Sequence, residues 1–223
     1  MQIFLDTANI DQIKQAAGLG IISGVTTNPS LLSKEATADY ETVTKKICEI
    51  VDGPVSVEVL SEDAKAMIKE AKAKAAWAPN VNIKIPITAE GLKATKVLSE
   101  EGIEVNMTLC FSPNQALLGA LAGAAYVSIF IGRLDDIGQD GMQVVEDSLT
   151  ILGNYPELDT ELIAASIRHP MHVTYAAMAG ADIATVPYAV LMQMIQHPLT
   201  DTGIKRFLAD WKSVEKNSNK ERT

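Results

Sequence analysis

A lysine inside a short apolar segment is the residue of this sequence with the greatest chemical potential. Lys84 lies in NIKIP (82–86), between Ile83 and Ile85. If this segment is a buried strand, burial disfavours the charged form of the lysine and leaves a neutral amine that can attack a carbonyl carbon. Amines of this kind form Schiff bases. The alternative is a structural lysine that pairs with an acidic residue or extends to solvent from an edge strand.

Two carboxylates could serve such an amine. Asp6 ends the segment IFLD (3–6), and Glu58 lies in VSVEV (55–59). Schiff-base chemistry needs proton transfers at the carbinolamine and at the hydroxyl next to the bond that breaks, and two carboxylates in different surroundings can divide these tasks. The alternative is that one of them only neutralises Lys84.

Two arginines are suited to an anionic substrate group. Arg133 lies in IGRLDDIG, and Arg168 lies in SIRHP, just before a helix that begins with a proline. Guanidinium groups beside a helix N-terminus fit a phosphate monoester. Arg133 could instead pair with its neighbours Asp135 and Asp136.

These residues belong to a regular alternation of short strands and helices. The alternation predicts strands at residues 3–6, 22–27, 55–59, 82–86, 104–109, 126–131, 162–166 and 183–186. Helix starts are predicted at Asn9, Ser61, Ser112 and His169, and helix ends at Gly102, Gly123 and Gly180. Eight such units predict a single α/β domain, a (β/α)₈ TIM barrel. A doubly wound sheet is the alternative, but the glycine-rich turn typical of its first strand is replaced here by DTANID.

Polar residues recur near the carboxyl end of nearly every predicted strand. They are Asp6, Thr26, Asn28, Glu58, Lys84, Asn106, Thr108, Ser128, Ser166 and Arg168. A single buried polar side chain is usually a hydrogen-bonded part of the core. Since the carboxyl ends of barrel strands meet at one face, their agreement across seven strands predicts one active site there.

Composition and charge limit the functional classes. A formal net charge of −9 over 223 residues disfavours nucleic acid and anionic membranes as partners. No segment approaches the roughly 20 apolar residues of a membrane span, and the first residues lack the features of a signal peptide. Cys48 and Cys110 have no CxxC or His/Cys neighbours, so we expect no metal, no disulfide and a cytoplasmic location.

The C-terminal region differs from the rest. We expect the barrel domain to cover residues 1–211 and a polar tail to fray over 212–223. Before the tail, apolar residues at helical spacing predict a homo-oligomer, unless they pack on their own barrel; they are Ile204, Phe207, Leu208 and Trp211. The three histidines His169, His172 and His197 are expected in exposed or capping positions.

The assembled segments resemble the small transaldolase subfamily, which includes fructose-6-phosphate aldolase. The similar segments are FLDTANI (4–10), GVTTNPSLL (24–32), VSVEV (55–59), IKIPIT (83–88), GRLDDIGQDGM (132–142), AASIRHP (164–170) and TVPY (185–188). They extend from the first predicted strand to the eighth. The resemblance implies a class I aldolase-type barrel without a cofactor, and pentamers or decamers of the chain.

The resemblance also implies a role for each site residue. Lys84 would form the Schiff base with a ketose phosphate, and Asp6 would act as acid and base toward the substrate hydroxyl. Glu58 would work through a water held with Thr108. Residues that would contact the substrate are Thr26, Asn28, Asn106, Ser128 and Phe130, and those that would bind its phosphate are Arg133, Ser166 and Arg168.

Two positions bear on the reaction type. Aldolase members of the resembled family have glutamine and tyrosine where this chain has Glu58 and Phe130. The resemblance therefore implies a transaldolase of the non-oxidative pentose phosphate pathway. Its donor would be sedoheptulose 7-phosphate or fructose 6-phosphate, and its acceptor glyceraldehyde 3-phosphate or erythrose 4-phosphate. The alternatives are a fructose-6-phosphate aldolase that releases dihydroxyacetone, a deoxyribose-phosphate aldolase barrel and a non-catalytic barrel that binds sugar phosphates.

Overall fold

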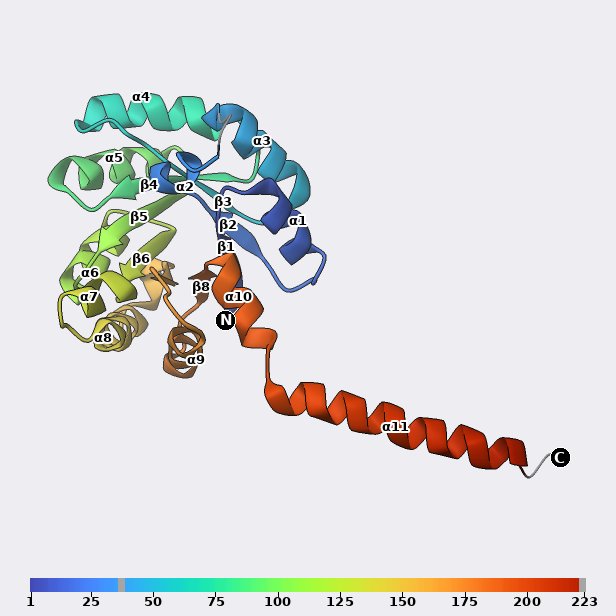
Figure 1. Ribbon diagram of the computed structural model, residues 1–223. Coiled ribbons are helices and arrows are strands. Elements are labelled where there is room, and N and C mark those ends of the chain that lie inside the picture. The colour runs from blue at the N-terminus through green and yellow to red at the C-terminus, as the bar shows by residue number, and fades with distance from the viewer. Residues whose placement is uncertain (36–38, 221–223) are drawn as a thin grey trace.

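The computed structural model describes residues 1–35 and 39–220, with side chains described as far as Val214. Eight parallel strands form one closed barrel in sequence order, and at least one helix follows each strand (Figure 1). The strands are β1 (Gln2–Asp6), β2 (Gly24–Thr26), β3 (Val55–Glu58), β4 (Val81–Pro86), β5 (Val105–Cys110), β6 (Tyr126–Phe130), β7 (Glu161–Ala165) and β8 (Ile183–Val186). The predicted (β/α)₈ barrel is confirmed, and a doubly wound sheet is excluded.

The helices surround the barrel. They are α1 (Ile10–Ala17), α2 (Pro29–Leu32), α3 (Tyr40–Ile50), α4 (Ala64–Ala75), α5 (Ala89–Glu100), α6 (Pro113–Leu121), α7 (Ile131–Asp136), α8 (Gly141–Gly153), α9 (Pro170–Ala179), α10 (Tyr188–Ile195) and α11 (Pro198–Lys220), with a 3₁₀ turn, η1 (Pro156–Leu158), before β7. Asn9 and Ser112 cap α1 and α6 as predicted. No helix in the described part of the chain combines the length and hydropathy needed to cross a membrane.

The predicted start of α4 at Ser61 is wrong. Asp63 is the N-cap, and its carboxylate accepts from the backbone N–H of Ala66 at 3.0 Å. Ser61 instead donates through its hydroxyl, at 2.7 Å, to Glu70 of the same helix. Both residue types are good caps, and tertiary contact with Glu70 engages the serine.

Strand β2 is shorter than the predicted 22–27. Asn28 caps α2 by accepting from the backbone N–H of Leu31 at 2.9 Å, so the chain leaves the sheet directly after Thr27. At the start of the strand, a Cβ on Gly24 would lie 2.7 Å from both the Phe4 ring and a backbone oxygen. Only glycine fits that close approach.

The lower interior of the barrel, toward the amino ends of the strands, is mostly apolar but also buries Asn82, and the upper interior is mostly polar. Side chains alternate along each strand, so every second residue points outward into an apolar cluster shared with the helices, as Leu5, Val25 and Val57 do. Phe4 and Tyr126 contact each other edge to face and close the lower interior. Two residues further along, the interior positions are polar, so the carboxyl ends of the strands enclose a polar site.

The C-terminal helix α11 extends away from the barrel beyond α10 (Figure 1). We expected a polar tail to fray over 212–223; α11 is described as far as Lys220, and 221–223 lie outside the described residues. The segment contains no proline and no glycine after Gly203, and lysine and glutamate favour helix. The division of the chain into a domain 1–211 and a tail stays a prediction.

Candidate active site

A pocket of about 150 Å³ opens at the carboxyl ends of the strands. Most of the predicted site residues line it: Asp6, Thr26, Asn28, Lys84, Ser128, Phe130, Arg133, Ser166 and Arg168, together with Ala165 and Thr185. The other three predicted residues, Glu58, Asn106 and Thr108, lie on β3 and β5, the neighbours of β4. Seven strands therefore bring their predicted polar residues to one face.

Lys84 lies at the centre of this face. Its side chain is 6% exposed. The Nζ atom lies 3.5 Å from a carboxylate oxygen of Glu58 and donates to the backbone carbonyl of Thr27 at 3.3 Å. The Phe130 ring centroid is 6.0 Å away. The ion pair that the sequence left open as a structural role is therefore present, and the same amine also borders the pocket.

Asp6 is the second titratable group on the floor of the pocket. The hydroxyl of Thr26 donates to its carboxylate at 2.8 Å. Burial raises the pKa of Asp6, and this effect exceeds the opposing attraction of Lys84 and the hydrogen bond from Thr26. Because the carboxyl keeps its proton to a higher pH than an ordinary aspartate, it is better suited than an exposed aspartate to give as well as take a proton.

Glu58 and Thr108 lie on either side of Lys84 along the sheet. In the sheet register, Glu58 of β3 is the partner of Lys84, and Thr108 of β5 is the partner of Pro86, two residues after Lys84 on β4. Thr108 is fully buried, and its hydroxyl has no hydrogen-bond partner among the described residues. A bulge in β5 between Met107 and Cys110, with Leu109 at φ 59°, accompanies this placement.

Asn106 and Asn28, both expected to contact the substrate, also make hydrogen bonds within the protein. The Asn106 amide donates to Ser56 Oγ at 3.0 Å and accepts from Ser128 Oγ at 2.7 Å, so it holds Ser128 at the pocket floor. Asn28 lines the pocket, but its Oδ1 caps α2. The Asn28 amide nitrogen is the group left for a substrate hydroxyl.

The two arginines lie at the rim. The guanidinium of Arg133 stacks 5.0 Å from the Phe130 ring centroid, and that of Arg168 donates to Asp136 at 2.8 Å. Asp136 thus pairs with Arg168, not with Arg133 as the sequence alternative had it. Ser166, at φ 58°, is in the left-handed region, and its carbonyl accepts from Gly132.

His172 is not in the exposed or capping position that we expected. It is 5% exposed. Its Nε2 lies 3.0 Å from Asp135, and its Nδ1 accepts from the backbone N–H of Arg168 at 3.3 Å. Burial and neighbouring His169 lower the pKa of His172 more than Asp135 raises it. The neutral ring therefore supports the backbone that presents Arg168.

Sequence reasoning missed three residues around the pocket. Thr185 supplies the polar position of β8, and its hydroxyl contacts that of Thr26. The rule that found the other strand ends would have found it in IATV. Thr27 contributes a backbone carbonyl, and Tyr40, on α3 outside the barrel, contacts Thr27 and Glu58. Neither residue therefore leaves a signal in the strand pattern.

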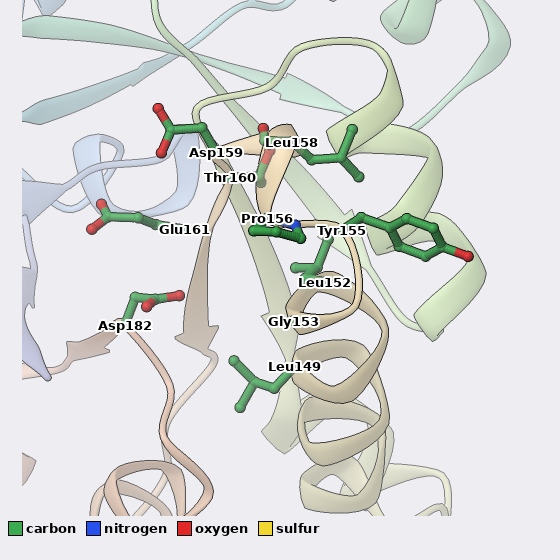
Figure 2. Close-up of a pocket in the computed structure, with 10 residues that line it drawn as sticks. All are labelled: Leu149, Leu152, Gly153, Tyr155, Pro156, Leu158, Asp159, Thr160, Glu161 and Asp182. Carbon is green, nitrogen blue, oxygen red and sulfur yellow. Dashed lines mark hydrogen bonds between the residues drawn. The ribbon is translucent and has the colours of Figure 1, made fainter.

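A larger pocket, of about 390 Å³, lies at the opposite end of the barrel and has different chemistry (Figure 2). Asp159, Glu161 and Asp182 line it with Tyr155 and several leucines, and its lining residues include no lysine or arginine. Burial and the neighbouring Asp182 and Asp159 raise the pKa of Glu161. Such an acidic surface disfavours an anionic substrate. No three His, Cys, Asp or Glu side chains within the described residues are grouped to hold a metal.

Comparisons with known proteins agree with this geometry. Residues 3–219 match the model of the family described as Transaldolase/Fructose-6-phosphate aldolase. A probable transaldolase of Dehalococcoides mccartyi is 61% identical over 97% of this chain and 100% of its own length. A probable transaldolase of Caldicellulosiruptor saccharolyticus is 60% identical over 98% and 100%.

One solved structure extends the comparison to fold alone. Thiamine phosphate pyrophosphorylase from Pyrococcus furiosus has a TM-score of 0.59 and 12% sequence identity, and the match covers 85% of this chain and 86% of that one.

Proposed function

Since the chain belongs to the transaldolase/fructose-6-phosphate aldolase family, we propose that it is a transaldolase that transfers a dihydroxyacetone unit between sugar phosphates through a Schiff base on Lys84. The supporting observation is a buried amine beside carboxylates from two other strands, beneath two arginines. Donors would be sedoheptulose 7-phosphate or fructose 6-phosphate. Acceptors would be glyceraldehyde 3-phosphate or erythrose 4-phosphate.

In the first half of the reaction, the neutral amine of Lys84 attacks the ketose carbonyl carbon. The carbinolamine loses water to give an iminium ion. Glu58 would move the required protons through a water bound to the Thr108 hydroxyl, which is buried and has no hydrogen-bond partner among the described residues. Ser128, at the pocket floor, donates its own hydrogen to Asn106 and would accept a hydrogen bond from the carbinolamine hydroxyl.

Bond cleavage then needs a base at the neighbouring hydroxyl. Asp6 takes that proton, the C3–C4 bond breaks, and its electron pair moves into the iminium to give an enamine on Lys84. The aldose phosphate leaves. Asn28 would hold substrate hydroxyls, with Asn106 below fixing Ser128.

The second half reverses these steps on a different aldehyde. The enamine attacks the acceptor carbonyl, Asp6 returns its proton to the new alkoxide, and water hydrolyses the iminium to release the product ketose. Arg133, Ser166 and Arg168 at the rim would hold the phosphate of both donor and acceptor. No electron acceptor or metal is needed for this balance.

Trapping the iminium tests the proposal directly. Fructose 6-phosphate with borohydride should leave a dihydroxyacetone-sized or hexose-sized adduct on the peptide that contains Lys84, and Lys84→Met should leave none. A barrel that only binds sugar phosphates would give reversible binding without an adduct. Deoxyribose-phosphate aldolase activity would instead give an acetaldehyde-derived adduct when deoxyribose 5-phosphate replaces fructose 6-phosphate in the same experiment.

The competing aldolase activity differs only in the fate of the fragment. Phe130 lines the pocket 6.0 Å from the Lys84 amine and has no hydroxyl to protonate the enamine. Phe130→Tyr should therefore raise the release of free dihydroxyacetone from fructose 6-phosphate, more so with Glu58→Gln. If the unmodified protein releases dihydroxyacetone without an acceptor as fast as it transfers it to erythrose 4-phosphate, the aldolase assignment holds instead.

We also propose a homo-oligomer, a pentamer or decamer as in the resembled subfamily, and a cytoplasmic role in the non-oxidative pentose phosphate pathway. Support for the oligomer comes from α11, where the expected stripe is more than half exposed: Ile204, Phe207, Leu208 and Trp211. Both cysteines are free thiols, which agrees with a reducing compartment. A monomer in light scattering at micromolar concentration would contradict the oligomer.

A further inference from the structure

The hydrogen-bonded ladder between β2 and β3 stops before Glu58, the residue of β3 that pairs with Lys84 of β4. Thr27 N–H donates to the carbonyl of Ser56 at 3.2 Å. In a continued parallel ladder, the N–H of Glu58 would then donate to the carbonyl of Thr27. Instead, Glu58 N–H donates to the phenol oxygen of Tyr40 at 2.8 Å, and the Thr27 carbonyl accepts from Lys84 Nζ at 3.3 Å.

Tyr40 also holds the side chain of Thr27. The two hydroxyls lie 3.3 Å apart, and Thr27 Oγ1 donates its own hydrogen to Ser56 at 2.8 Å. Tyr40 is therefore the donor to Thr27. Burial raises the pKa of Tyr40 to about 12, so the phenol keeps this hydrogen at neutral pH. One hydroxyl thus contacts both residues that contact the Lys84 amine.

Helix α4 fixes the tyrosine in turn. The Lys74 ammonium lies 4.7 Å from the Tyr40 ring centroid, and the Trp77 ring contacts it edge to face at 5.5 Å. Lys74 Nζ also donates to the Glu58 carbonyl at 2.7 Å and pairs with Glu70 at 2.7 Å. Both backbone groups of Glu58 that β2 leaves without a strand partner are therefore held by side chains from α3 and α4.

We propose that Tyr40 is a positioning residue for Lys84, a role that rests on the proposed Schiff-base function. By taking the Glu58 N–H, it frees the Thr27 carbonyl to accept one N–H of the lysine, while a carboxylate oxygen of Glu58 lies 3.5 Å from the same nitrogen and attracts the other. A neutral amine with two N–H groups so engaged has one tetrahedral direction left for its lone pair, which is then available to the substrate carbonyl.

The test compares Tyr40→Phe with Tyr126→Phe. Tyr126 is a matched control, because its phenol is also covered, contacts Glu104 at 3.5 Å and lies at the other end of the barrel. Tyr40→Phe should lower kcat and the rate of borohydride-trapped imine formation about tenfold, the scale of one hydrogen bond, and change KM for phosphorylated donors less than twofold. Tyr126→Phe should leave kcat and the trapping rate unchanged.

Two measurements do not depend on sugar chemistry. Tyr40→Phe should speed amide exchange at Glu58, because its acceptor is lost, and slow the reductive methylation of Lys84 by formaldehyde and cyanoborohydride. If the unmodified protein forms no sugar adduct, the proposed function fails, and these two readouts still decide the role of Tyr40. If Tyr40→Phe does not fold, Thr27→Val should slow methylation in the same sense. Unchanged exchange and methylation, or an equal loss in Tyr126→Phe, would overturn the proposal.

Discussion

Replacing Arg168 by alanine tests how the pocket recognises the substrate phosphate. The Arg168 guanidinium borders the pocket, and its side chain is 52% exposed. It already donates to Asp136, whose side chain is 62% exposed, at 2.8 Å. A phosphate therefore has to compete with an existing but solvated partner.

The magnitude follows from that competition. A charge-assisted hydrogen bond to phosphate contributes about 1.5–3 kcal/mol, and an exposed ion pair about 0.2–1 kcal/mol. The difference leaves about 1–2 kcal/mol for Arg168, so Arg168→Ala should lower kcat/KM for a phosphorylated donor by about 5- to 30-fold. Asp136→Asn removes the competitor and should raise it by about 1.4- to 5-fold.

The assay uses fructose 6-phosphate and fructose as donors, with unphosphorylated glyceraldehyde as the acceptor in both. The donor phosphate is then the only difference, and activity with fructose should hardly change in either variant. If Arg168→Ala lowers both activities equally, the arginine is structural. If Asp136→Asn lowers kcat/KM for the phosphorylated donor, the ion pair with Asp136 positions Arg168 for the phosphate and does not compete with the phosphate for the arginine.

Two further predictions concern titratable groups. Asp6→Asn should lower kcat by about 10²–10⁴-fold, as expected for loss of a general acid–base group. The pKa of Asp6 in the folded protein is raised above 3.8, so ionisation of this carboxyl destabilises the fold as pH rises through the folded-state pKa. Asp6→Asn removes the charge and should therefore raise the melting temperature at pH 7 in calorimetry. A lower melting temperature would contradict the direction of the pKa shift. The pKa of His172 is lowered, so the unfolded chain takes up its proton first, and melting temperature should fall as pH drops below about 6.5. His172→Gln should reduce this decrease of the melting temperature at low pH. If the variant shows the same pH dependence, the decrease is due to other groups.

Strand alternation and polar strand ends were enough to predict the barrel and the face of the site. In a closed parallel barrel the inward positions of neighbouring strands meet. The position of a polar residue such as Lys84 or Asp6 within its strand is therefore enough to place it at the site. The roles assigned to these residues stay predictions until the trapping and kinetic measurements are made.

What the sequence could not predict depends on contacts between distant segments. The pairing of Arg168 with Asp136 joins the loop after β7 to α7, although Asp136 is close to Arg133 in sequence. His172 is buried and pairs with Asp135 of α7, a contact between separate segments that a short helical pattern does not reveal.

Three interruptions of regular backbone lie at the carboxyl face, and each is next to a candidate residue. Strand β2 ends early and frees the Thr27 carbonyl, and β5 bulges at Leu109 beside Thr108. Strand β7 is followed directly by Ser166, which is in the left-handed region before Arg168. A complete ladder would engage these backbone groups within the sheet and leave fewer of them for an amine or a phosphate. The left-handed residues cost of order 1 kcal/mol each, a cost that persists only where surrounding contacts over-determine the conformation. Glu58, whose backbone groups lack a partner on β2, is held instead by hydrogen bonds to Tyr40 and Lys74, which is why helices outside the barrel belong in the account of chemistry inside it.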